Sequence, residues 1–192
     1  MNFVQRTVVL IKPDGVRRGH VGEILARFEK VGLKVVAMKM VWVDPDLVGK
    51  HYKDDNDYLK TVGDKTLENY KKYGSEPGED LGTNDPVEIG KMVRRWNIDA
   101  LTNGPLVAIL LEGIEAVGVV RKLIGPTNIA VAVPGTIRGD FSSDSLMYAN
   151  VQKRPIRTIV HASGNVEEAE FEIKLWFREG EIFDYKRFGE EE

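Results

Sequence analysis

Residues 157–176 read Arg157-Thr-Ile-Val-His161-Ala-Ser-Gly-Asn165-Val-Glu-Glu-Ala-Glu-Phe-Glu-Ile-Lys-Leu-Trp176. The apolar pair before His161 predicts a short strand, and apolar residues at helical spacing after Asn165 predict an amphipathic helix. Asn165 and Glu168 are typical of a capping box, in which the first amide donors of the helix begin at the cap. The sequence therefore places His161 at a strand-to-helix junction, facing the start of the helix.

The start of that helix suggests what His161 does. Unpaired amide groups and the helix dipole attract anions and disfavour a protonated imidazole nearby. A neutral imidazole that faces an incoming phosphate is a competent nucleophile. We therefore expect His161 to attack a phosphate group, and this hypothesis requires cationic partners from elsewhere in the chain.

The composition restricts the class of protein. With 192 residues, 42% of them hydrophobic, the chain can bury one core, and we expect a single domain over residues 1–192. It has no cysteine, which excludes disulfides and thiolate metal sites and makes an intracellular location the simpler interpretation. The net charge is −3, and no block of like charges stands out except the tail Glu190–Glu192, which argues against a nucleic-acid or membrane surface. No apolar run is long enough for a signal peptide or a membrane-spanning helix.

Strands and helices alternate along the rest of the chain, and glycine or proline ends most of them. The spacing predicts strands over 7–11, 33–43 and 105–111, a turn at 134–141 that leads into a short strand, and helices over 20–31, 45–52 and 115–124. Because segment 105–111 is apolar throughout, we expect it to be a buried central strand.

Two segments interrupt this alternation. Residues 53–102 contain a helical stripe from Tyr58 to Tyr73, a loop rich in Gly, Pro and acids, and a second helix opened by Asp85-Pro86-Val87-Glu88. We interpret them as a helical insertion that covers part of the core. Residues 142–156 are polar and irregular, and predict a second insertion or long loop.

Without the insertions the elements follow the order βαββαβ, which is the ferredoxin-like split arrangement of the α+β class. It predicts an antiparallel sheet with helices on one face. Enzymes, regulatory modules and RNA-binding domains all use this fold, so it does not select a function.

Three cations are candidates for phosphate contacts: Lys12, Arg121 and Arg138. Lys12 lies at a strand end and Arg138 lies between two glycines, although Lys12 is equally consistent with an exposed lysine and Arg121 with a complement of the helix dipole. No P-loop or Rossmann glycine run is present, so a nucleotide would bind without either. We interpret His20 as an exposed residue at a helix start, and His51 with Tyr52 as a partly buried polar pair.

Several motifs, in the same order, resemble the nucleoside diphosphate kinase family. They are Lys12-Pro-Asp-Gly-Val16, Gly22-Glu-Ile24, Asn103-Gly-Pro105, Pro134-Gly-Thr-Ile-Arg-Gly-Asp-Phe141, His161-Ala-Ser163, Ala169-Glu-Phe-Glu-Ile173 and Trp176-Phe177. The resemblance implies a ping-pong reaction in which His161 takes the γ-phosphate of ATP and passes it to a nucleoside diphosphate, balancing (deoxy)nucleoside triphosphate pools. It implies Mg²⁺ as the cofactor, bound through the nucleotide phosphates and not by protein side chains.

The resemblance also implies roles for individual residues in nucleotide binding. Lys12 and Arg138 match phosphate and ribose contacts, Arg121 and Thr127 match contacts to the β-phosphate, and Tyr52 matches a tyrosine that lines the pocket. Positioning and charge neutralisation by these groups would carry much of the rate.

Ser163 and Glu172 match the pair that orients the histidine. In a helical projection Glu172 lies beside Ala169 and Ile173, where a carboxylate needs a partner such as an imidazole N–H.

Three features depart from the family pattern. Thr158 stands where the family usually has an asparagine that contacts the sugar, and a hydroxyl can still donate and accept. Ala162 replaces a usual glycine and Gly164 a usual aspartate. The aromatic residue that stacks on the base falls inside the insertion, where Tyr58-Leu59 matches it loosely and Leu59 is the residue that we place there. Stacking tolerates any base, so that contact would give broad base specificity.

Two other functions compete with the kinase. A homologue with reduced catalysis could serve as a nucleotide-sensing module, which Thr158 and the insertions favour, although the retained His161 and its partners argue against it. An RNA-binding module of the same fold would need a basic face and aromatic strands, which this sequence lacks.

The expected partners are ATP and nucleoside diphosphates, with no nucleic acid and no membrane. Phe171 and Leu175 give the last long helix a second apolar side, which suits contact with another subunit or with the C-terminal segment. The resemblance implies a homo-oligomer, a hexamer or alternatively a tetramer, and we expect a cytoplasmic location.

Overall fold

The computed structural model describes residues 3–188, so the tail Glu190–Glu192 lies outside the described residues. One four-stranded sheet has the order β2-β3-β1-β4, and all its neighbouring strands are antiparallel. The strands are β1 (Val4–Ile11), β2 (Lys34–Val41), β3 (Leu106–Ile114) and β4 (Val160–Ala162). This order confirms the ferredoxin-like arrangement, and β3 is the buried central strand that its apolar run predicts.

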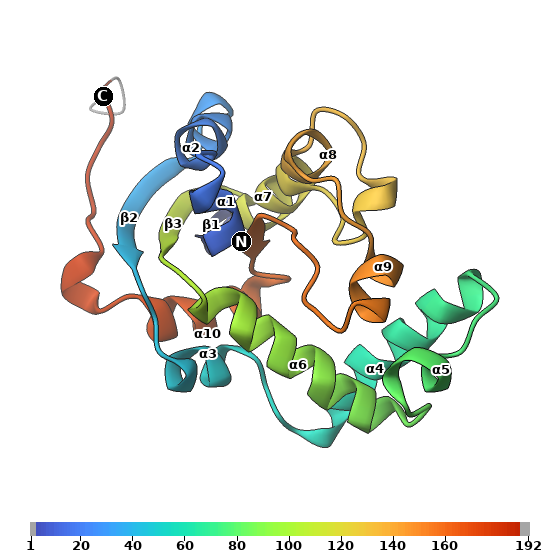
Figure 1. The fold of residues 1–192 in the computed structure, drawn as a ribbon. Helices are drawn as coiled ribbons and strands as arrows, with labels where there is room; N and C mark the ends of the chain where they lie inside the picture. Colours follow the sequence, from blue (N-terminus) through green and yellow to red (C-terminus); the bar gives the residue numbers. More distant parts are fainter. Residues whose placement is uncertain (1–2, 189–192) are drawn as a thin grey trace.

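Helices connect and flank these strands (Figure 1). The longer ones are α2 (Val21–Lys30), α4 (Asn56–Lys72), α6 (Pro86–Thr102), α7 (Ala116–Ile124) and α10 (Val166–Trp176). Shorter ones are α1 (Pro13–Arg17), α3 (Pro45–His51), α5 (Pro77–Leu81), α8 (Ile137–Phe141), α9 (Leu146–Val151) and the 3₁₀ turns η1 (Ile129–Val131) and η2 (Glu179–Glu181). None of the helices within residues 3–188 has the length and apolar content that a membrane span requires.

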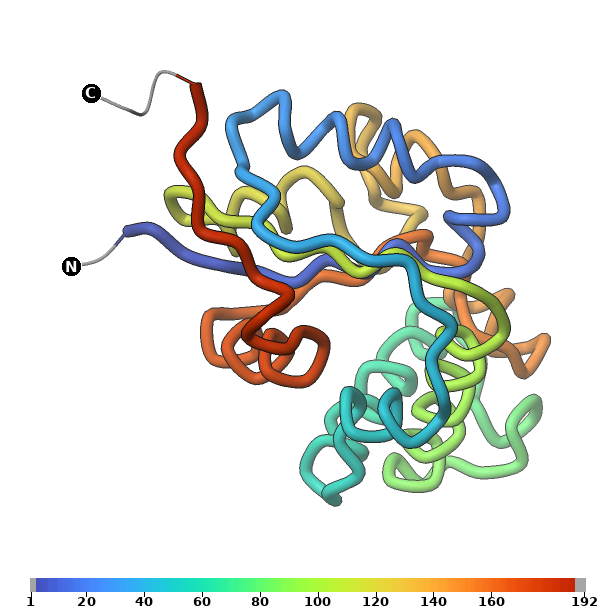
Figure 2. Tube along the Cα trace, turned by 90° about the vertical axis from the view of Figure 1, so that its left-hand side faces the viewer, coloured from blue at the N-terminus to red at the C-terminus, as the bar shows by residue number. Residues whose placement is uncertain are grey.

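Helices cover both faces of the sheet, so the prediction of helices on one face is wrong. Neighbouring residues of β1 point to opposite faces: Val9 and Ile11 pack with α2 and α7, whereas Val8 and Leu10 pack with α3, α6 and α10. Figure 2 shows the sheet nearly edge-on with helices above and below it. Both faces of β1 are buried, which explains why its apolar run is unbroken.

Helices α4 and α6 form the predicted helical insertion and pack backbone against backbone. Asp55 and Asp85 cap them by accepting hydrogen bonds from backbone N–H groups three residues on. A Cβ on Gly63 would lie 1.8 Å from the carbonyl oxygen of Pro86, and one on Gly90 would lie 2.0 Å from that of Leu59. The two helices can therefore approach this closely only with glycine at both places.

Three segments predicted as turns or loops contain short helices. Residues 137–141 form α8 instead of leading into a strand, because the Thr136 hydroxyl caps a helix by accepting from the N–H of Gly139. Residues 142–156 contain α9, which Ser145 caps in the same way, and Pro13 occupies the first position of α1. Local capping and proline geometry decided these segments, and hydrophobic periodicity carries little information about elements of five or six residues.

Candidate active site

His161 is the middle residue of β4 and pairs with Leu10 of β1. The strand ends at Ala162, and α10 starts four residues later behind the cap Asn165, whose side chain accepts from the N–H of Glu168 at 2.8 Å. The Glu168 carboxylate accepts from the N–H of Gly164, one residue before the cap, at 2.8 Å. The predicted strand-to-helix junction is present, with a cap shifted by one residue from the standard capping box.

The backbone just before His161 has an unusual conformation that two hydrogen bonds hold. Ile159 has φ of 66°, in the left-handed region that a β-branched residue rarely adopts. Its N–H donates to the Asp14 carboxylate at 3.0 Å, and its carbonyl accepts from the N–H of Lys12 at 2.8 Å. The turn after β1 therefore fixes the chain that presents His161.

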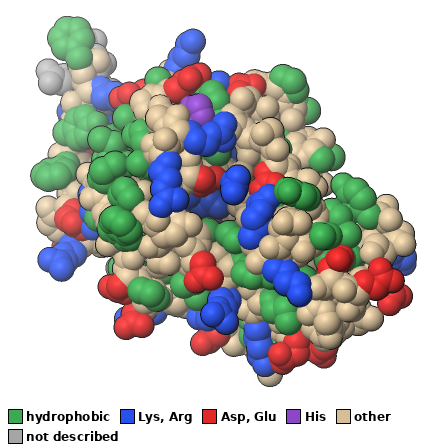
Figure 3. All heavy atoms as spheres, in the orientation of Figure 1, with side chains coloured by type: hydrophobic (Ala, Val, Ile, Leu, Met, Phe, Trp, Pro, Cys, Tyr) green, Lys and Arg blue, Asp and Glu red, His purple; other side chains and the backbone are tan. Residues whose placement is uncertain are grey.

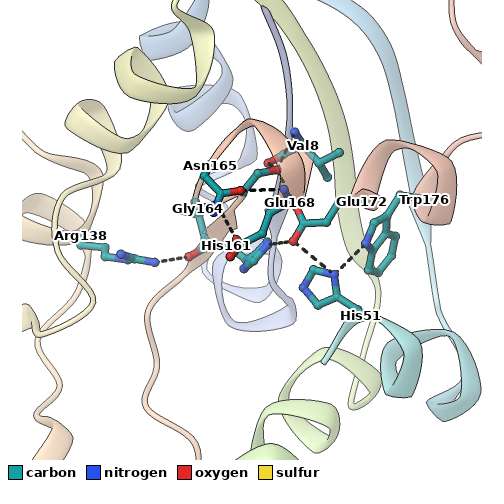
Figure 4. A network of polar contacts seen from close by, with 11 residues as sticks. Val8, His51, Arg138, His161, Gly164, Asn165, Glu168, Glu172 and Trp176 are labelled. Carbon is teal, nitrogen blue, oxygen red and sulfur yellow. Dashed lines mark hydrogen bonds and ion pairs between the residues drawn. The ribbon is translucent and has the colours of Figure 1, made fainter. Parts of the chain in front are cut away.

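Glu172 orients the imidazole of His161 from the facing side of α10 (Figure 4). The Nε2 atom of His161 lies 2.8 Å from Oε1 of Glu172, and the hydroxyl of Ser163 donates to Oε2 of Glu172 at 2.6 Å. Ser163 is itself fixed, since its hydroxyl oxygen accepts from the N–H of Val8 at 3.3 Å. The structure thus contains the imidazole partner that a carboxylate at position 172 requires.

Electrostatics keep Glu172 ionised. Burial alone would raise the pKa of its carboxyl, but the hydrogen bond from His161 and the nearby imidazoles and Ser163 outweigh burial and lower it. An ionised carboxylate accepts the Nε2–H of His161, which selects the tautomer with a lone pair on Nδ1. No described residue forms a hydrogen bond with that Nδ1 atom. Nδ1 is therefore the imidazole nitrogen of His161 that keeps a lone pair.

His51 is a member of this cluster that sequence reasoning missed. Its ring packs edge-on against the ring of His161 with centroids 4.5 Å apart, and its Nδ1 accepts from the indole N–H of Trp176 at 3.2 Å. Burial, with the neighbouring His161, lowers the pKa of His51 to about 3, so this imidazole is neutral. A signal was available: His51 follows Val48 by three residues on the buried face of α3, where a polar group needs a partner.

Within residues 3–188, one group of His, Asp and Glu side chains could hold a metal ion, and it consists of His51, His161 and Glu172. The ligand atoms of His51, His161 and Glu172 lie within 4.8 Å of one another. Two of these groups are imidazoles, which suit zinc or copper, whereas Mg²⁺ takes oxygen ligands. This cluster does not fit Mg²⁺.

The three predicted cations converge on the strand that carries His161. Arg138 is 7% exposed, and its guanidinium donates to the carbonyls of Gly125 and Val160, each at 2.8 Å. Burial and the nearby Arg121 lower the pKa of Arg138 to about 10, and burial with the nearby Arg138 lowers that of Lys12. Within residues 3–188, no carboxylate lies within 4.0 Å of the charged nitrogens of Lys12, Arg121 or Arg138. Positive charge without a paired carboxylate is suited to a phosphate.

The surface beside these cations is hollowed and basic. Figure 3 shows Lys and Arg side chains around a hollow in the middle of the face drawn. A cavity of about 250 Å³ there is lined by Lys12, Arg17, Arg154 and Arg157 among others. A second cavity of about 390 Å³ lies between the insertion helices and residues 146–156.

Four predicted site residues remain, namely Tyr52, Thr127, Thr158 and Leu59. Tyr52 packs edge-on against His51 with ring centroids 4.7 Å apart, and the hydroxyl of Thr127 lies 3.4 Å from a guanidinium nitrogen of Arg138. Thr158, two residues before Val160, is 5% exposed. Leu59 is not brought to the site: it is 3% exposed and is absent from the lining of the 390 Å³ cavity, whereas its neighbour Tyr58 contributes to that lining.

Sequence comparison identifies the family. The family model described as nucleoside diphosphate kinase matches residues 5–62 and 89–182. The chain belongs to the nucleoside diphosphate kinase family. The unmatched residues 63–88 lie inside the helical insertion, so the family match spans the sheet, the His161 cluster and the three cations.

Similar proteins agree with this family assignment. The nucleoside diphosphate kinase of Pyrobaculum aerophilum is 46% identical over 181 residues, which cover 94% of this chain and 99% of that protein. The enzyme of Borreliella burgdorferi is 39% identical over 187 residues, which cover 96% of this chain and 94% of that protein.

Solved structures of the same two enzymes share the fold. The crystal structure of the P. aerophilum NDP kinase has a TM-score of 0.91 at 45% identity and covers 94% of this chain and 100% of that one. A B. burgdorferi structure described as a transition state mimic with bound vanadate and ADP has a TM-score of 0.76 at 38% identity and covers 96% of this chain and 94% of that one. The present chain is accordingly a phosphotransferase: it passes the γ-phosphate of ATP to nucleoside diphosphates in a ping-pong reaction through a phosphohistidine, and so balances nucleoside triphosphate pools.

Proposed function

We propose that Nδ1 of His161 is the nucleophile of this nucleoside diphosphate kinase. The observation that carries the proposal is the 2.8 Å contact between Nε2 of His161 and Glu172, which leaves the lone pair on Nδ1. Nδ1 attacks the γ-phosphorus of ATP as the bond to the bridging oxygen breaks, and ADP leaves. In the second half-reaction an oxygen of the acceptor's terminal phosphate attacks the same phosphorus and restores the neutral imidazole.

Glu172 and Ser163 hold the imidazole during both half-reactions. When Nδ1 bonds to phosphorus the ring gains positive charge, and the ionised carboxylate of Glu172 stabilises that charge through Nε2–H. The hydroxyl of Ser163, which donates to Oε2 of Glu172 at 2.6 Å, keeps the carboxylate in place. The histidine therefore needs no rotation between the two states.

Lys12, Arg121, Arg138 and Thr127 bind the nucleotide phosphates, with Lys12 and Arg138 nearest the transferred group and the ribose, and Arg121 and Thr127 at the β-phosphate. The convergence of positive charge without paired carboxylates beside β4 supports these assignments. Tyr52 lines the site and Thr158 contacts the sugar. The family resemblance places Leu59 at the stacking position, but the burial of Leu59 favours its neighbour Tyr58 there.

The residues present fit Mg²⁺ carried by the nucleotide. The cationic groups around the proposed phosphate positions offer no carboxylate cage, so Mg²⁺ would be held by phosphate oxygens. Bound in that way, it supplies positive charge that screens the β- and γ-phosphates. Lys12, Arg121 and Arg138 then orient the phosphates for in-line attack.

The whole chain acts as one nucleoside diphosphate kinase-like domain in this proposal, in the cytoplasm where ATP and nucleoside diphosphates are metabolised. It assembles as a homo-oligomer, a hexamer or alternatively a tetramer. The exposed Phe171 on α10 and the exposed Met38, Met40 and Trp42 on and after the edge strand β2 support contact between subunits. Sedimentation that detects only monomer would contradict the oligomer.

Intact-mass measurement tests the nucleophile. Protein incubated with ATP and Mg²⁺ should gain one acid-labile phosphate, and added GDP should remove it. His161→Ala should gain none, while His20→Ala, a histidine stacked on Phe141 away from the cluster, should behave as the wild type. A phosphate adduct that persists in folded His161→Ala would refute the assignment.

A further inference from the structure

Arg94, in the middle of α6, holds the backbone at the end of α3. Its Nε–H donates to the carbonyl of Tyr52 at 2.9 Å and to that of Lys53 at 3.1 Å, and one terminal NH₂ group donates to the carbonyl of Gly49 at 2.9 Å. The Arg94 side chain is 21% exposed, so most of it is removed from water. One guanidinium therefore binds three carbonyls where α3 ends.

Helix α3 is too short to hold its own end. It has seven residues, and the last carbonyls of any α-helix lack partners further along the helix. Gly49 lies in its last turn and is a poor helix former. Such a short helix frays unless another element supplies donors, and an arginine at a helix C-terminus supplies donors together with a favourable charge. The conformation at the end of α3 therefore depends on Arg94.

The helix that carries Arg94 is itself firmly held. α6 packs against α4 so closely that a Cβ on Gly90 would lie 2.0 Å from the carbonyl oxygen of Leu59. At the other end of α6, the carbonyl of Thr102 accepts from the indole N–H of Trp42 at 2.8 Å. The insertion thus gives the guanidinium a fixed position.

The backbone that Arg94 holds carries a ring that packs against His161 (Figure 4). His51 is the last residue of α3, and its ring meets that of His161 edge-on, with centroids 4.5 Å apart and 79° between the ring planes. Glu172 holds Nε2 of His161, so the neighbouring ring of His51 restricts the tilt of the imidazole about that hydrogen bond. A shift of the end of α3 would move the surface against which the imidazole rests.

We propose that Arg94 is a positioning residue for phosphoryl transfer: it holds the end of α3 so that the ring of His51 keeps the imidazole of His161 aimed at the γ-phosphate. The proposal rests on His161 as the nucleophile of the proposed function. Orientation matters because a misplacement of about 1 Å can lower a rate about a hundredfold. The insertion then contributes to the reaction and does not only cover the core.

A double-mutant cycle on the first half-reaction tests the proposal. The measured quantity is the single-turnover rate at saturating ATP and Mg²⁺, at a temperature where circular dichroism shows each variant to be folded. Arg94→Ala should lower this rate about tenfold, and His51→Gln, which removes the ring, should lower it by a similar factor. In the His51→Gln background, Arg94→Ala should cost less than about twofold, because the two residues act through one another.

Two control variants separate the carbonyl contacts from charge. Asp54, which is 83% exposed, lies 3.8 Å from the guanidinium of Arg94, and Asp54→Asn removes this ion pair while keeping the three hydrogen bonds. Asp54→Asn and Arg95→Ala, the latter exposed on the same helix, should therefore keep the wild-type rate. Arg94→Lys keeps the charge but cannot donate to three carbonyls from one place, so its rate should lie between those of Arg94→Ala and the wild type.

Trp176 provides a second readout that a loss of stability alone would not move. Its indole N–H donates to Nδ1 of His51 at 3.2 Å, so its signal in a proton–nitrogen correlation NMR spectrum reports where that ring lies. Trp42→Phe and Trp96→Phe remove the other two indole signals and so assign it. In Arg94→Ala the Trp176 signal should move to lower proton chemical shift as this hydrogen bond weakens, and in Arg95→Ala it should stay in place.

The outcomes are separable. A wild-type rate in folded Arg94→Ala, an equal loss in both backgrounds, or an unmoved Trp176 signal would each overturn positioning through His51. If Arg94→Ala does not fold, the same criteria apply to Arg94→Lys. Absence of phosphohistidine in the wild type would instead remove the proposed function itself.

Discussion

The Nε2 atom of His161 and the Oε1 atom of Glu172 lie 2.8 Å apart across the junction of β4 and α10. This contact joins residues eleven positions apart in the chain, and it sets which imidazole nitrogen can react. Because the strand ends at Ala162 and α10 begins four residues later, about 1.7 turns of helix bring Glu172 back over the histidine.

Glu172→Gln should slow phosphorylation of His161 strongly while leaving the protein folded. A glutamine can still accept a hydrogen bond, but it carries no negative charge to stabilise the phosphorylated ring. We expect the single-turnover rate with ATP to fall about a hundredfold, within the range of positioned acid–base partners. Rapid-quench kinetics measures the rate, and circular dichroism checks the fold. A rate within twofold of the wild type would exclude the electrostatic role.

The stability of the protein should decrease as the pH falls below about 6.5, because His51 is buried in its neutral form. Its pKa is about 3 in the folded chain against 6.5 in the unfolded chain. Between these values the unfolded chain binds a proton that the folded chain excludes, so the free energy of unfolding falls with decreasing pH, by up to about 1.4 kcal/mol per pH unit. The contribution is full above pH 6.5.

Urea titrations between about pH 5 and about pH 7, above the ordinary pKa of carboxyl groups, isolate this effect. His51→Gln keeps an acceptor for the indole of Trp176 and does not titrate, so the pH dependence should flatten. An equally steep dependence in the variant would show that another group is responsible.

Asp14→Ala should lower the stability of the protein, because Asp14 holds Ile159, the strained residue two positions before His161. Asp14 accepts the N–H of Ile159, a residue with φ of 66° that is fully buried. Leaving that N–H without a partner should cost about 1–3 kcal/mol of stability. Asp14→Asn retains an acceptor oxygen and should stay close to the wild type. Thermal unfolding and phosphorylation rate together check this, and equal losses in both variants would mean that charge, not the hydrogen bond, matters.

Much of the fold could be predicted from sequence, because the β-branched runs and helical stripes are long. The segments that could not be predicted were short or depended on tertiary contacts. Hydrophobic periodicity carries no reliable signal for α8 or α9, where the caps Thr136 and Ser145 decide the conformation. The second helical layer was missed because β1 is apolar on both faces, a pattern compatible with one or two covering layers.

Site residues that belong to sequence motifs could be predicted, whereas residues that only tertiary packing brings to the site could not. Glu172 could be inferred, because a carboxylate on the buried stripe of α10 requires a donor. His51 could not be connected to His161, since 110 positions separate them and only the packing of α3 against α10 brings the rings together. Leu59 aligned with the stacking residue, yet the close pairing of α4 and α6 buries it and turns Tyr58 to the cavity.

Arg138→Lys should reduce catalysis although it keeps the charge. The planar guanidinium donates at once to the carbonyls of Gly125 and Val160, which a single ammonium group cannot do from the same place. We expect kcat/KM for ATP to fall about a hundredfold, as for the loss of one preorganised donor at a transferring group. Arg95→Lys, exposed on α6, is the matched control and should show wild-type kinetics. Similar losses in both variants would argue against a local role.

Thr158 should determine how the enzyme treats the sugar of its substrate. The residue is 5% exposed and lies two residues before Val160, whose carbonyl accepts from Arg138, and the family resemblance assigns its position to a sugar contact. Thr158→Val keeps the branched shape and removes the hydroxyl. If the hydroxyl binds the ribose, KM for ADP should rise about fivefold, the effect of one neutral hydrogen bond, and KM for dADP should rise less. Thr158→Ser, which keeps the hydroxyl, should preserve the ratio of the two KM values. Equal increases for ADP and dADP in Thr158→Val would show that Thr158 supports the backbone at His161 and makes no sugar contact.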